Sequence, residues 1–455
     1  MPFLTRKRLK RFFLFFLLLL ILAAVALFSP VDRTPYREMP YYQQFRQGIV
    51  SLPTPKPPIG ADTLQIGWAK VNITPPKAMP TAGYAHRWGK PYTAVHDSIW
   101  VRAFVFDNGI EQAALVSVDL LIIAPELTNA LARRLPEIGM SIDKVYLCAT
   151  HSHNSIGGWA DRIVGRLIAG KYDPDLVTFL ADRFLQAIIQ AAQHREKAAI
   201  GTIAYPSGEL VENRLRINHP TDSLLRVMKI RKKSGQTAII TSFSAHPTLI
   251  SDQDIRLSRD YPGALVDSLE ASPAIDFAAF CAGAVGSHSV EIGGADPWEH
   301  IQNEATALVR KIKLSIAQIP LSYYTQLRTV AVPLPLRDAH FRITQNWRVR
   351  PWVFSALYGD YPVTVKGLRI GNTVWVGVPA DFSGELTPLV QPFDDWQQSP
   401  LFITSFNGGY IGYVTPDAYY DWQASEVREM NWFGPYNGAY MTEAMREAVK
   451  YLRRE

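Results

Sequence analysis

The sequence predicts an α/β fold with a mixed β-sheet core and flanking helices. Short apolar runs bounded by turn-forming residues recur along the chain, and such runs are typical of buried strands. Stretches with helical spacing lie between them, and this alternation favours a sheet with helices on its faces. Polar side chains follow several of the apolar runs, where ligands bind in sheets of this kind.

The first element is an uninterrupted apolar run, Phe12–Phe28, behind a basic cluster. Its length lies at the lower limit of a bilayer span, roughly 17 to 25 residues, and exceeds most signal-peptide cores. The preceding positive charges predict a cytoplasmic N-terminus, with the rest of the chain periplasmic or extracellular. We expect residues 1–30 to form an uncleaved signal anchor. Ala24-Val25-Ala26 also resembles a signal-peptidase site, and cleavage there would give a secreted protein.

Composition fits a folded domain without a nucleic-acid partner. The 455 residues are 47% hydrophobic and 19% charged, enough for a sizeable core. The formal net charge is +6, and the N-terminal cluster supplies five of these charges, from Arg6, Lys7, Arg8, Lys10 and Arg11. The remainder is close to neutral and gives no electrostatic case for binding nucleic acid. The sequence does not define an oligomeric state.

A Pro-rich segment, residues 31–62, separates the anchor from the remaining chain, and Ser51–Pro58 is its densest part. Such composition predicts an extended tether that holds the domain close to the membrane. The alternative is that Tyr41–Val50 forms a short helix packed on the domain. Residues 63–455 are expected to form one catalytic domain.

Strands and helices then alternate along this domain. The expected strands are Ala113–Val118, Lys144–Ala149, Thr237–Thr241, Ile275–Cys281, Thr373–Pro379 and Leu401–Phe406. The expected helices are Pro125–Leu135, Asp175–His194, Pro262–Ala271 and Glu443–Arg453. The aromatic-rich stretch Trp347–Thr364 has no regular spacing, and we interpret it as an insertion that either walls a hydrophobic groove or packs into the core.

The string Thr150–Gly158 carries the most chemistry, because it places two imidazoles, two serine hydroxyls and a Gly-Gly turn directly after a strand. Neutral imidazole is a common zinc ligand, and a tight turn can aim His151 and His153 at one point. The pair therefore indicates a metal site at the carboxyl end of a strand. The alternative is two solvated loop histidines.

Only 10 histidines occur, and two others follow predicted strands in the same way. His246 comes after Thr237–Thr241, and Pro247 biases it toward an extended backbone. His288 comes after Ile275–Cys281, in a Gly-rich turn with two serines. Acidic and phenolic side chains follow further strands, namely Asp119, Asp381, Tyr410 and Tyr413. This repetition is stronger evidence for a site than any single motif.

Several of these pieces together resemble the catalytic domain of the neutral (non-lysosomal) ceramidase family. The matching strings are Ala149–Ser155 with Gly157-Gly158, Asn213-Arg214, Ala245–Pro247, Ser258–Gly263, Val378–Phe382 and Tyr410–Thr415. Ile66–Pro75 and His96–Ala103 resemble the first two strands of the family. The order is collinear from about residue 63 to about residue 450.

The resemblance implies a zinc-dependent hydrolase of amides. It assigns the metal ligands to His151, His246, Asp381 and Tyr413, a nitrogen and oxygen set that suits Zn²⁺. Asp381 stands where the family has glutamate, so either its loop must approach the metal more closely or its carboxylate must bind differently. The family's C-terminal β-sandwich domain is not expected in this chain.

The catalytic residues implied by the resemblance are His153, Arg214 and Ser289. His153 would face the substrate as a proton donor, and Arg214 would stabilise an oxyanion. Ser289 takes the place of the family's serine, although Ser287 is an equally good match, because the surrounding string differs. The substrate would be a ceramide-like lipid, split into fatty acid and sphingoid base. The alternatives are another amide or ester, such as a cell-wall or other N-acyl compound, and an inactive membrane-tethered binding protein.

The two cysteines, Cys148 and Cys281, each lie near the end of a strand that leads to the predicted site. A disulfide is chemically allowed outside the cytoplasm. We expect both to be free, because unpaired cysteine is common in protein cores.

Overall fold

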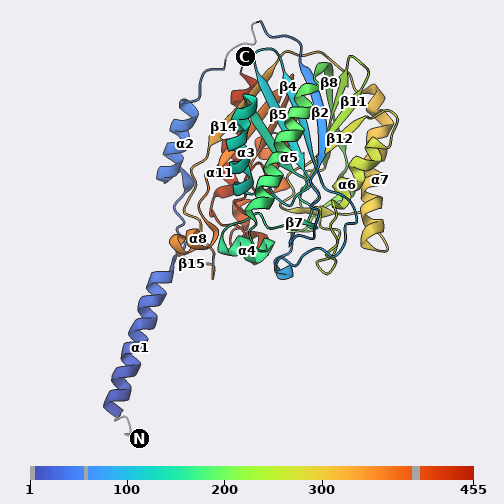
Figure 1. The fold of residues 1–455 in the computed structure, drawn as a ribbon. Coiled ribbons are helices and arrows are strands. Elements are labelled where there is room, and N and C mark those ends of the chain that lie inside the picture. The colour runs from blue at the N-terminus through green and yellow to red at the C-terminus, as the bar shows by residue number, and fades with distance from the viewer. Residues whose placement is uncertain (1–5, 56–59, 392–399, 455) are drawn as a thin grey trace.

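Two stacked β-sheets form the core of the computed structural model, which describes residues 6–55, 60–391 and 400–454 (Figure 1). Over these residues the larger sheet has eight strands, in the order β12 (Phe277–Ala282), β11 (Thr237–Phe243), β10 (Leu224–Lys232), β8 (Glu196–Pro206), β2 (Gln65–Asn72), β4 (Trp100–Asp107), β5 (Gln112–Val118) and β6 (Val145–Ala149). The smaller sheet has the order β14 (Leu327–Pro333), β16 (Thr364–Ile370), β17 (Thr373–Gly377) and β19 (Leu401–Thr404).

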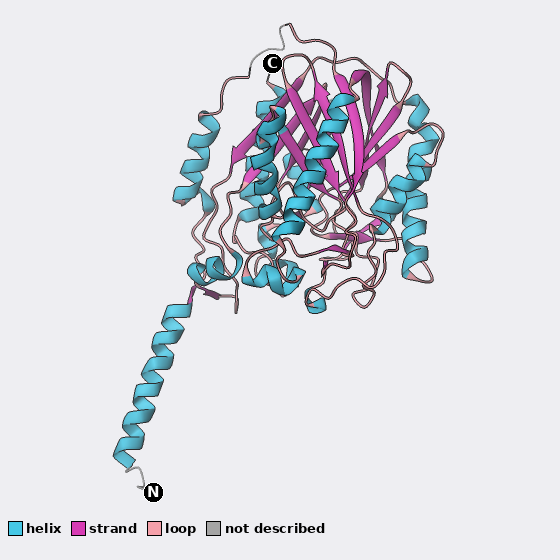
Figure 2. Ribbon diagram, viewed as in Figure 1, coloured by secondary structure: helices cyan, strands magenta, loops and turns pink. Residues whose placement is uncertain are grey.

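Helices cover the outer face of each sheet (Figure 2). The larger sheet packs against α3 (Pro125–Arg134), α5 (Pro174–Gln193), α6 (Asp260–Glu270) and α7 (Pro297–Ser315). The smaller sheet packs against α11 (Asn437–Arg453). Both sheets combine parallel and antiparallel pairs. The predicted mixed sheet with flanking helices is therefore confirmed, and the stacking of a second sheet is an additional finding.

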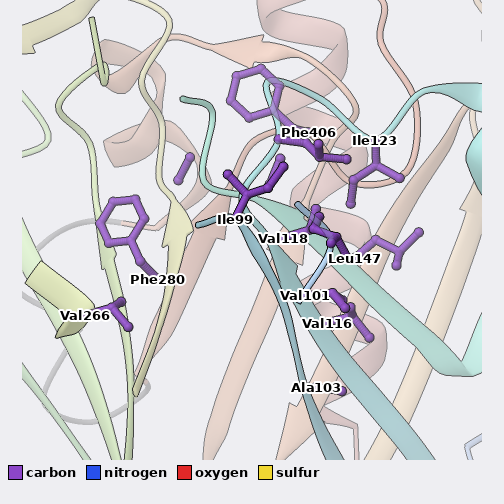
Figure 3. Close-up of a cluster of buried hydrophobic side chains, with 14 of the residues drawn as sticks. Ile99, Val101, Ala103, Val116, Val118, Ile123, Leu147, Val266, Phe280 and Phe406 are labelled. Carbon is purple, nitrogen blue, oxygen red and sulfur yellow. The ribbon is translucent and has the colours of Figure 1, made fainter. Parts of the chain in front are cut away.

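The strands are apolar throughout because both of their faces are buried. In β5, Val116 and Val118 point toward the helices, whereas Leu115 lies in the cluster between the two sheets. Val101 and Ala103 of β4 are directly opposite Val118 and Val116 and share the same face (Figure 3). This packing explains why the sequence shows continuous apolar runs rather than strict alternation.

Curling of the larger sheet brings its first and last strands together. The hydroxyl of Ser117 in β5 donates a 2.5 Å hydrogen bond to the carbonyl of Phe280 in β12, and β12 also contacts β6. Pairing between β2 and β8 is confined to two residue pairs, which lets the sheet bend there. The loops that follow β6, β11 and β12 consequently meet at one edge of the molecule.

The N-terminal helix α1 (Arg6–Leu27) projects away from the domain (Figure 1). Its segment Leu9–Leu27 has a mean hydropathy of 2.4 and is exposed along its length. Among the described residues it is the one helix long and apolar enough to cross a membrane. This agrees with a signal anchor or a signal peptide at the predicted place.

Residues 31–62 do not behave as a free tether over their described part. Helix α2 (Pro40–Val50) packs on the smaller sheet, and Tyr41 and Phe45 are buried there. The hydroxyls of Tyr36 and Tyr42 both donate hydrogen bonds to Glu443 of α11, at 2.8 and 2.7 Å. The expectation of an extended tether is corrected, because these aromatic side chains anchor the segment. The structure has the short packed helix that was its alternative.

Two further elements differ from expectation. Helix α11 begins at Asn437 rather than at Glu443, since Asp417 accepts hydrogen bonds from the first backbone amides, those of Gly438 and Ala439. The supposedly irregular stretch from Trp347 contains strand β15 (Trp347–Val349) and helix α8 (Pro351–Tyr358). Helix α8 shows no helical period in the sequence because apolar and aromatic residues lie on its exposed side as well as its buried side, as Trp352 and Phe354 show.

Candidate metal centre

Three imidazoles converge where β6 and β11 end. The Nε2 atom of His151 lies 3.0 Å from that of His246 and 3.2 Å from that of His153, and the last two are 2.9 Å apart. His151 and His153 come from the loop after β6, and His246 comes from the loop after β11. The three side chains form a cluster that can hold a metal ion.

The loop backbone holds His151 and His246 with one nitrogen directed into the cluster. The Nδ1 atom of His151 lies 2.7 Å from the carbonyl of Leu121, and that of His246 lies 3.3 Å from the carbonyl of Val285. A carbonyl only accepts, so each Nδ1 carries the proton and each Nε2 presents a lone pair. His151 adopts a left-handed backbone (φ 65°), which non-glycine residues rarely do outside functional sites.

An aromatic ring fixes the plane of the first imidazole. Phe406, from the loop after β19, stacks on His151 with 3.9 Å between ring centroids and 9° between planes. Phe406 also belongs to the apolar cluster beneath the helices (Figure 3). The hydrophobic core therefore extends directly to the histidine cluster. Its contact with Phe406 restricts rotation of the His151 ring.

Asp381 supplies a carboxylate to the same point. It begins β18 (Asp381–Phe382), which pairs in parallel with β20 (Tyr413–Val414) so that Asp381 lies beside Tyr413. Its Oδ1 lies 3.5 Å from Nε2 of His151 and has no hydrogen-bond partner among the described residues, although the residue is buried. Its Oδ2 accepts a 2.7 Å hydrogen bond from Tyr410. A buried carboxylate oxygen without a donor is costly, and a cation would satisfy it.

Arg214 and Tyr413 lie next to Asp381 and bond to each other. The guanidinium of Arg214 donates to the hydroxyl of Tyr413 at 3.1 Å and to the carbonyl of Gly286 at 3.3 Å. Its Nε lies 3.2 Å from Glu426. A Cβ atom on residue 286 would lie 2.5 Å from the carbonyl oxygen of Asp381, so glycine permits this close approach.

Burial sets the charge of these groups. Burial, together with the neighbouring imidazoles and Arg214, holds the pKa values of His151 and His246 well below their ordinary value. Burial first, then Arg214, lowers the pKa of His153 to about 3. The pKa of Asp381 is raised to about 7 by burial, and the Tyr410 hydrogen bond and Arg214 oppose that rise. All three imidazoles are therefore neutral at physiological pH, the form that binds metals.

The distances do not distinguish His153 from His151 and His246, the two histidines predicted as ligands, because the three Nε2 atoms lie at similar distances from one another. His153 differs in being partly exposed, whereas His151 and His246 are buried. Its ring also contacts that of Tyr84, with 5.1 Å between centroids.

The hydroxyls of the two predicted serines bond to groups other than the three imidazoles, although Ser289 is paired with His246 in an isolated β-bridge. Ser289 is in β13 (His288–Val290), and its hydroxyl donates to Glu212 at 2.9 Å on an exposed surface. Ser287 is buried, and its hydroxyl contacts Nδ1 of His288 and the hydroxyl of Ser383, both at 2.8 Å. His288 in turn accepts from the backbone amide of Asp222 at 3.0 Å. His288 is thus a buried structural residue, despite its strand-end position.

Two contributors were not among the predicted site residues. Tyr410 lies in the recognised string Tyr410–Thr415, so a signal for it was present. Glu426, the partner of Arg214, lies in the short helix α10 (Ser425–Arg428), and nothing in the local sequence marks it. Asp119, which follows a predicted strand, accepts from the backbone amide of Trp100 at 2.9 Å and serves the fold.

A cavity of about 300 Å³ leads to the centre. His151, His153, Asp381 and Tyr413 lie on its wall, and most of the remaining lining is apolar. Leu121, Ile122, Trp159, Ile168, Tyr358 and Trp432 provide that apolar surface. Tyr358 and Tyr361 come from the aromatic-rich stretch Trp347–Thr364, so this stretch does help to wall a hydrophobic pocket.

The fold and centre define an α/β protein with a buried imidazole and carboxylate site that can hold a metal ion. A model of the neutral/alkaline non-lysosomal ceramidase N-terminal domain matches residues 64–302 of the 455. The chain belongs to this family. The matched range contains His151, His153, Arg214 and His246, whereas Asp381 and Tyr413 lie beyond it.

Individual relatives agree with the family. Neutral ceramidase A of Dictyostelium discoideum is 29% identical over 223 residues, which are 44% of this chain and 30% of that protein. The chain thus matches less than a third of the length of this curated relative. The crystal structure of neutral ceramidase from Pseudomonas aeruginosa has a TM-score of 0.73 at 17% identity, covering 86% of this chain and 75% of that one. A ceramidase complexed with C2 gives 0.74 with the same identity and coverage.

Proposed function

We propose that this protein is a zinc-dependent amidohydrolase that splits a ceramide-like lipid into a fatty acid and a sphingoid base. One observation carries the proposal: three neutral imidazoles and an unpaired carboxylate oxygen lie together on the wall of an apolar cavity. The imidazoles suit a metal ion, and the cavity suits acyl chains. Membership of the ceramidase family supports this choice of substrate.

The donor set fits zinc. Zinc–nitrogen bonds of 2.0–2.1 Å in a tetrahedral site would place ligand atoms about 3.3 Å apart. The Nε2 atoms of His151 and His246 lie 3.0 Å apart, and Oδ1 of Asp381 lies 3.5 Å from Nε2 of His151. We assign His151, His246, Asp381 and Tyr413 as the residues that hold the ion. Zinc bound there would polarise the amide carbonyl and lower the pKa of a water molecule.

The remaining groups position and stabilise the reacting atoms. Arg214 is held by Glu426 and by the carbonyl of Gly286, so its guanidinium is placed to stabilise negative charge on the carbonyl oxygen. His153, the partly exposed imidazole, is neutral, so it takes a proton from the attacking water and passes it to the leaving amine. Water adds to the carbonyl carbon, the carbon–nitrogen bond breaks, and the products are a carboxylate and an amine. The hydroxyl of Ser289 donates a hydrogen bond to Glu212, and this favours water over Ser289 as the nucleophile.

We also propose that α1 anchors the protein, with the N-terminus cytoplasmic and the domain from residue 63 onward periplasmic or extracellular. The basic residues before the apolar segment support this orientation.

The test is release of fatty acid from a fluorescent ceramide by the full chain, with and without a chelator. We expect release that stops with the chelator and returns on addition of zinc. Replacing His194, an exposed residue at the end of α5, by Ala is the matched control and should leave release intact. Release that persists in the chelator would contradict metal dependence. No release in either condition would contradict ceramide as the substrate.

A further inference from the structure

The carboxyl end of α1 is fixed to the domain by hydrogen bonds to its last turn. The backbone amide of Arg350 donates to the carbonyl of Leu27 at 2.8 Å, and its Nε donates to that of Val25 at 2.8 Å. The indole of Trp352 donates to the carbonyl of Ala26 at 3.1 Å. A cationic side chain at a helix C-terminus also complements the helix dipole.

A strand pair continues this attachment. Directly after α1, β1 (Phe28–Pro30) pairs with β15 in antiparallel register, from Phe28 opposite Val349 to Pro30 opposite Trp347. The helix therefore does not join the domain through a free linker. Its end is held by both β15 and the first turn of α8, and this contact sets the direction in which α1 leaves the domain (Figure 1).

Exposed apolar side chains gather beside this attachment. Helix α4 (Ile163–Ala169) contacts α8, and both lie on the side of the domain from which α1 departs (Figure 1). We define the membrane-proximal face as Ile163 and Leu167 of α4, Trp352 of α8 and Trp347 of β15. Their side chains are 48–57% exposed. Large apolar groups clustered in this way mark an interaction surface, and tryptophan is enriched where proteins meet the membrane interface.

The same two helices wall the cavity of the metal centre. Gly165 and Ile168 of α4 and Tyr358 of α8 line it, and His151 and Asp381 lie on the same cavity wall. Helix α4 thus presents Ile163 and Leu167 outward and Gly165 and Ile168 inward. The cavity lining is mostly apolar, although the charged side chains of Glu126 and Arg162 also lie on it, so an acyl chain between these helices would contact mainly apolar surface.

We propose that the membrane-proximal face lies in the surface of the same bilayer that α1 spans, and that lipid enters the cavity from this bilayer between α4 and α8. The occupant of the face is the bilayer itself, because the spanning segment ends against it. The docking of the face is independent of the reaction, whereas the entry of substrate lipid rests on the proposed function.

The test places a probe on the face in the full chain reconstituted into phospholipid vesicles. Ile163→Cys is labelled with an environment-sensitive thiol dye, and Cys148 and Cys281 are buried and should stay unlabelled. Ile110→Cys is the matched control, since Ile110 is 56% exposed against 55% for Ile163 but lies in the β4–β5 turn, away from the strand ends that carry the site. Phospholipids brominated in the upper acyl chain should quench the dye at residue 163 and not at residue 110. Equal, weak quenching at both would overturn the proposal.

A second measurement separates docking from catalysis. Ile163→Asp should lower the ratio of turnover on bilayer-embedded ceramide to turnover on a soluble short-chain ceramide by about tenfold, because a carboxylate is costly in the bilayer interface. Ile110→Asp should leave the ratio unchanged. An unchanged ratio for Ile163→Asp would overturn lipid entry from the bilayer. Quenching at residue 163 in a protein that hydrolyses neither ceramide would preserve the docking face and reject the proposed function instead.

Discussion

Asp381 Oδ1 lies 3.5 Å from His151 Nε2, and it has no hydrogen-bond donor among the described residues. The two groups arrive from different sheets, since His151 follows β6 of the larger sheet and Asp381 follows β17 of the smaller one. Stacking of the two sheets is thus what creates the centre. Neither sheet alone would bring the imidazole nitrogens and the carboxylate together.

The role of His153 is tested by His153→Ala. If this imidazole transfers a proton and does not hold the metal, the variant keeps its metal and loses about 10²- to 10⁴-fold in kcat. Metal content and turnover should be measured on the same preparation. Loss of the metal together with turnover would show that His153 is a ligand, which its distance of 2.9 Å to His246 also allows.

Tyr410 orients the carboxylate, because its hydroxyl donates to Asp381 Oδ2 at 2.7 Å. Removing that hydroxyl in Tyr410→Phe should weaken metal binding by roughly 10- to 100-fold, as for other groups that hold a ligand in place. A competition titration with a metal-sensitive dye measures this. Tyr323→Phe is the control, because Tyr323 is 60% exposed and should bind metal normally. Unchanged affinity in Tyr410→Phe would contradict the positioning role.

Ser289→Ala tests the nucleophile. Because the hydroxyl of Ser289 donates to Glu212 and not toward the imidazoles, kcat should stay within about threefold of the wild type. A nucleophilic serine would instead cost several orders of magnitude when removed. A loss of that size with normal metal content would reinstate Ser289 as the attacking group.

Glu304 predicts a pH dependence of stability away from the centre. The residue is fully buried on α7, and neither of its oxygens has a partner among the described residues. Burial first, then the charges of Asp260 and Glu209, raises its pKa to about 8 from an ordinary value of 4.5. Between these values the folded state holds a proton that the unfolded chain releases. The free energy of unfolding should therefore fall as pH rises through this window, by up to about 1.4 kcal/mol per pH unit.

Glu304→Gln should make that slope shallower, since an amide does not ionise. Denaturant unfolding from pH 5 to pH 9 provides the measurement. Glu299→Gln, at an exposed position of the same helix, is the control and should keep the wild-type slope. Parallel pH profiles for the wild type and Glu304→Gln would contradict the assignment.

Several strands and the gathering of the histidines could be predicted because their signals are local. Buried strands such as β6 and β12 read as apolar runs, and the residues that follow them meet at one edge. The second sheet could not be predicted, because strands buried in either sheet have the same composition. The pairing of Glu426 with Arg214 joins distant segments, and Ser289 turns outward through strand pairing with β9 (Val211–Asn213). Such tertiary contacts leave no trace in a single sequence.

The most direct measurement is the metal content of the purified full chain beside that of Asp381→Asn. We expect about one zinc per chain in the wild type, because neutral imidazoles and an unpaired carboxylate oxygen lie together in a site of suitable size. The amide variant should lose most of it, since the substitution removes the charge and keeps the shape. Equal metal in both proteins, or none in the wild type, would contradict the assignment of the centre.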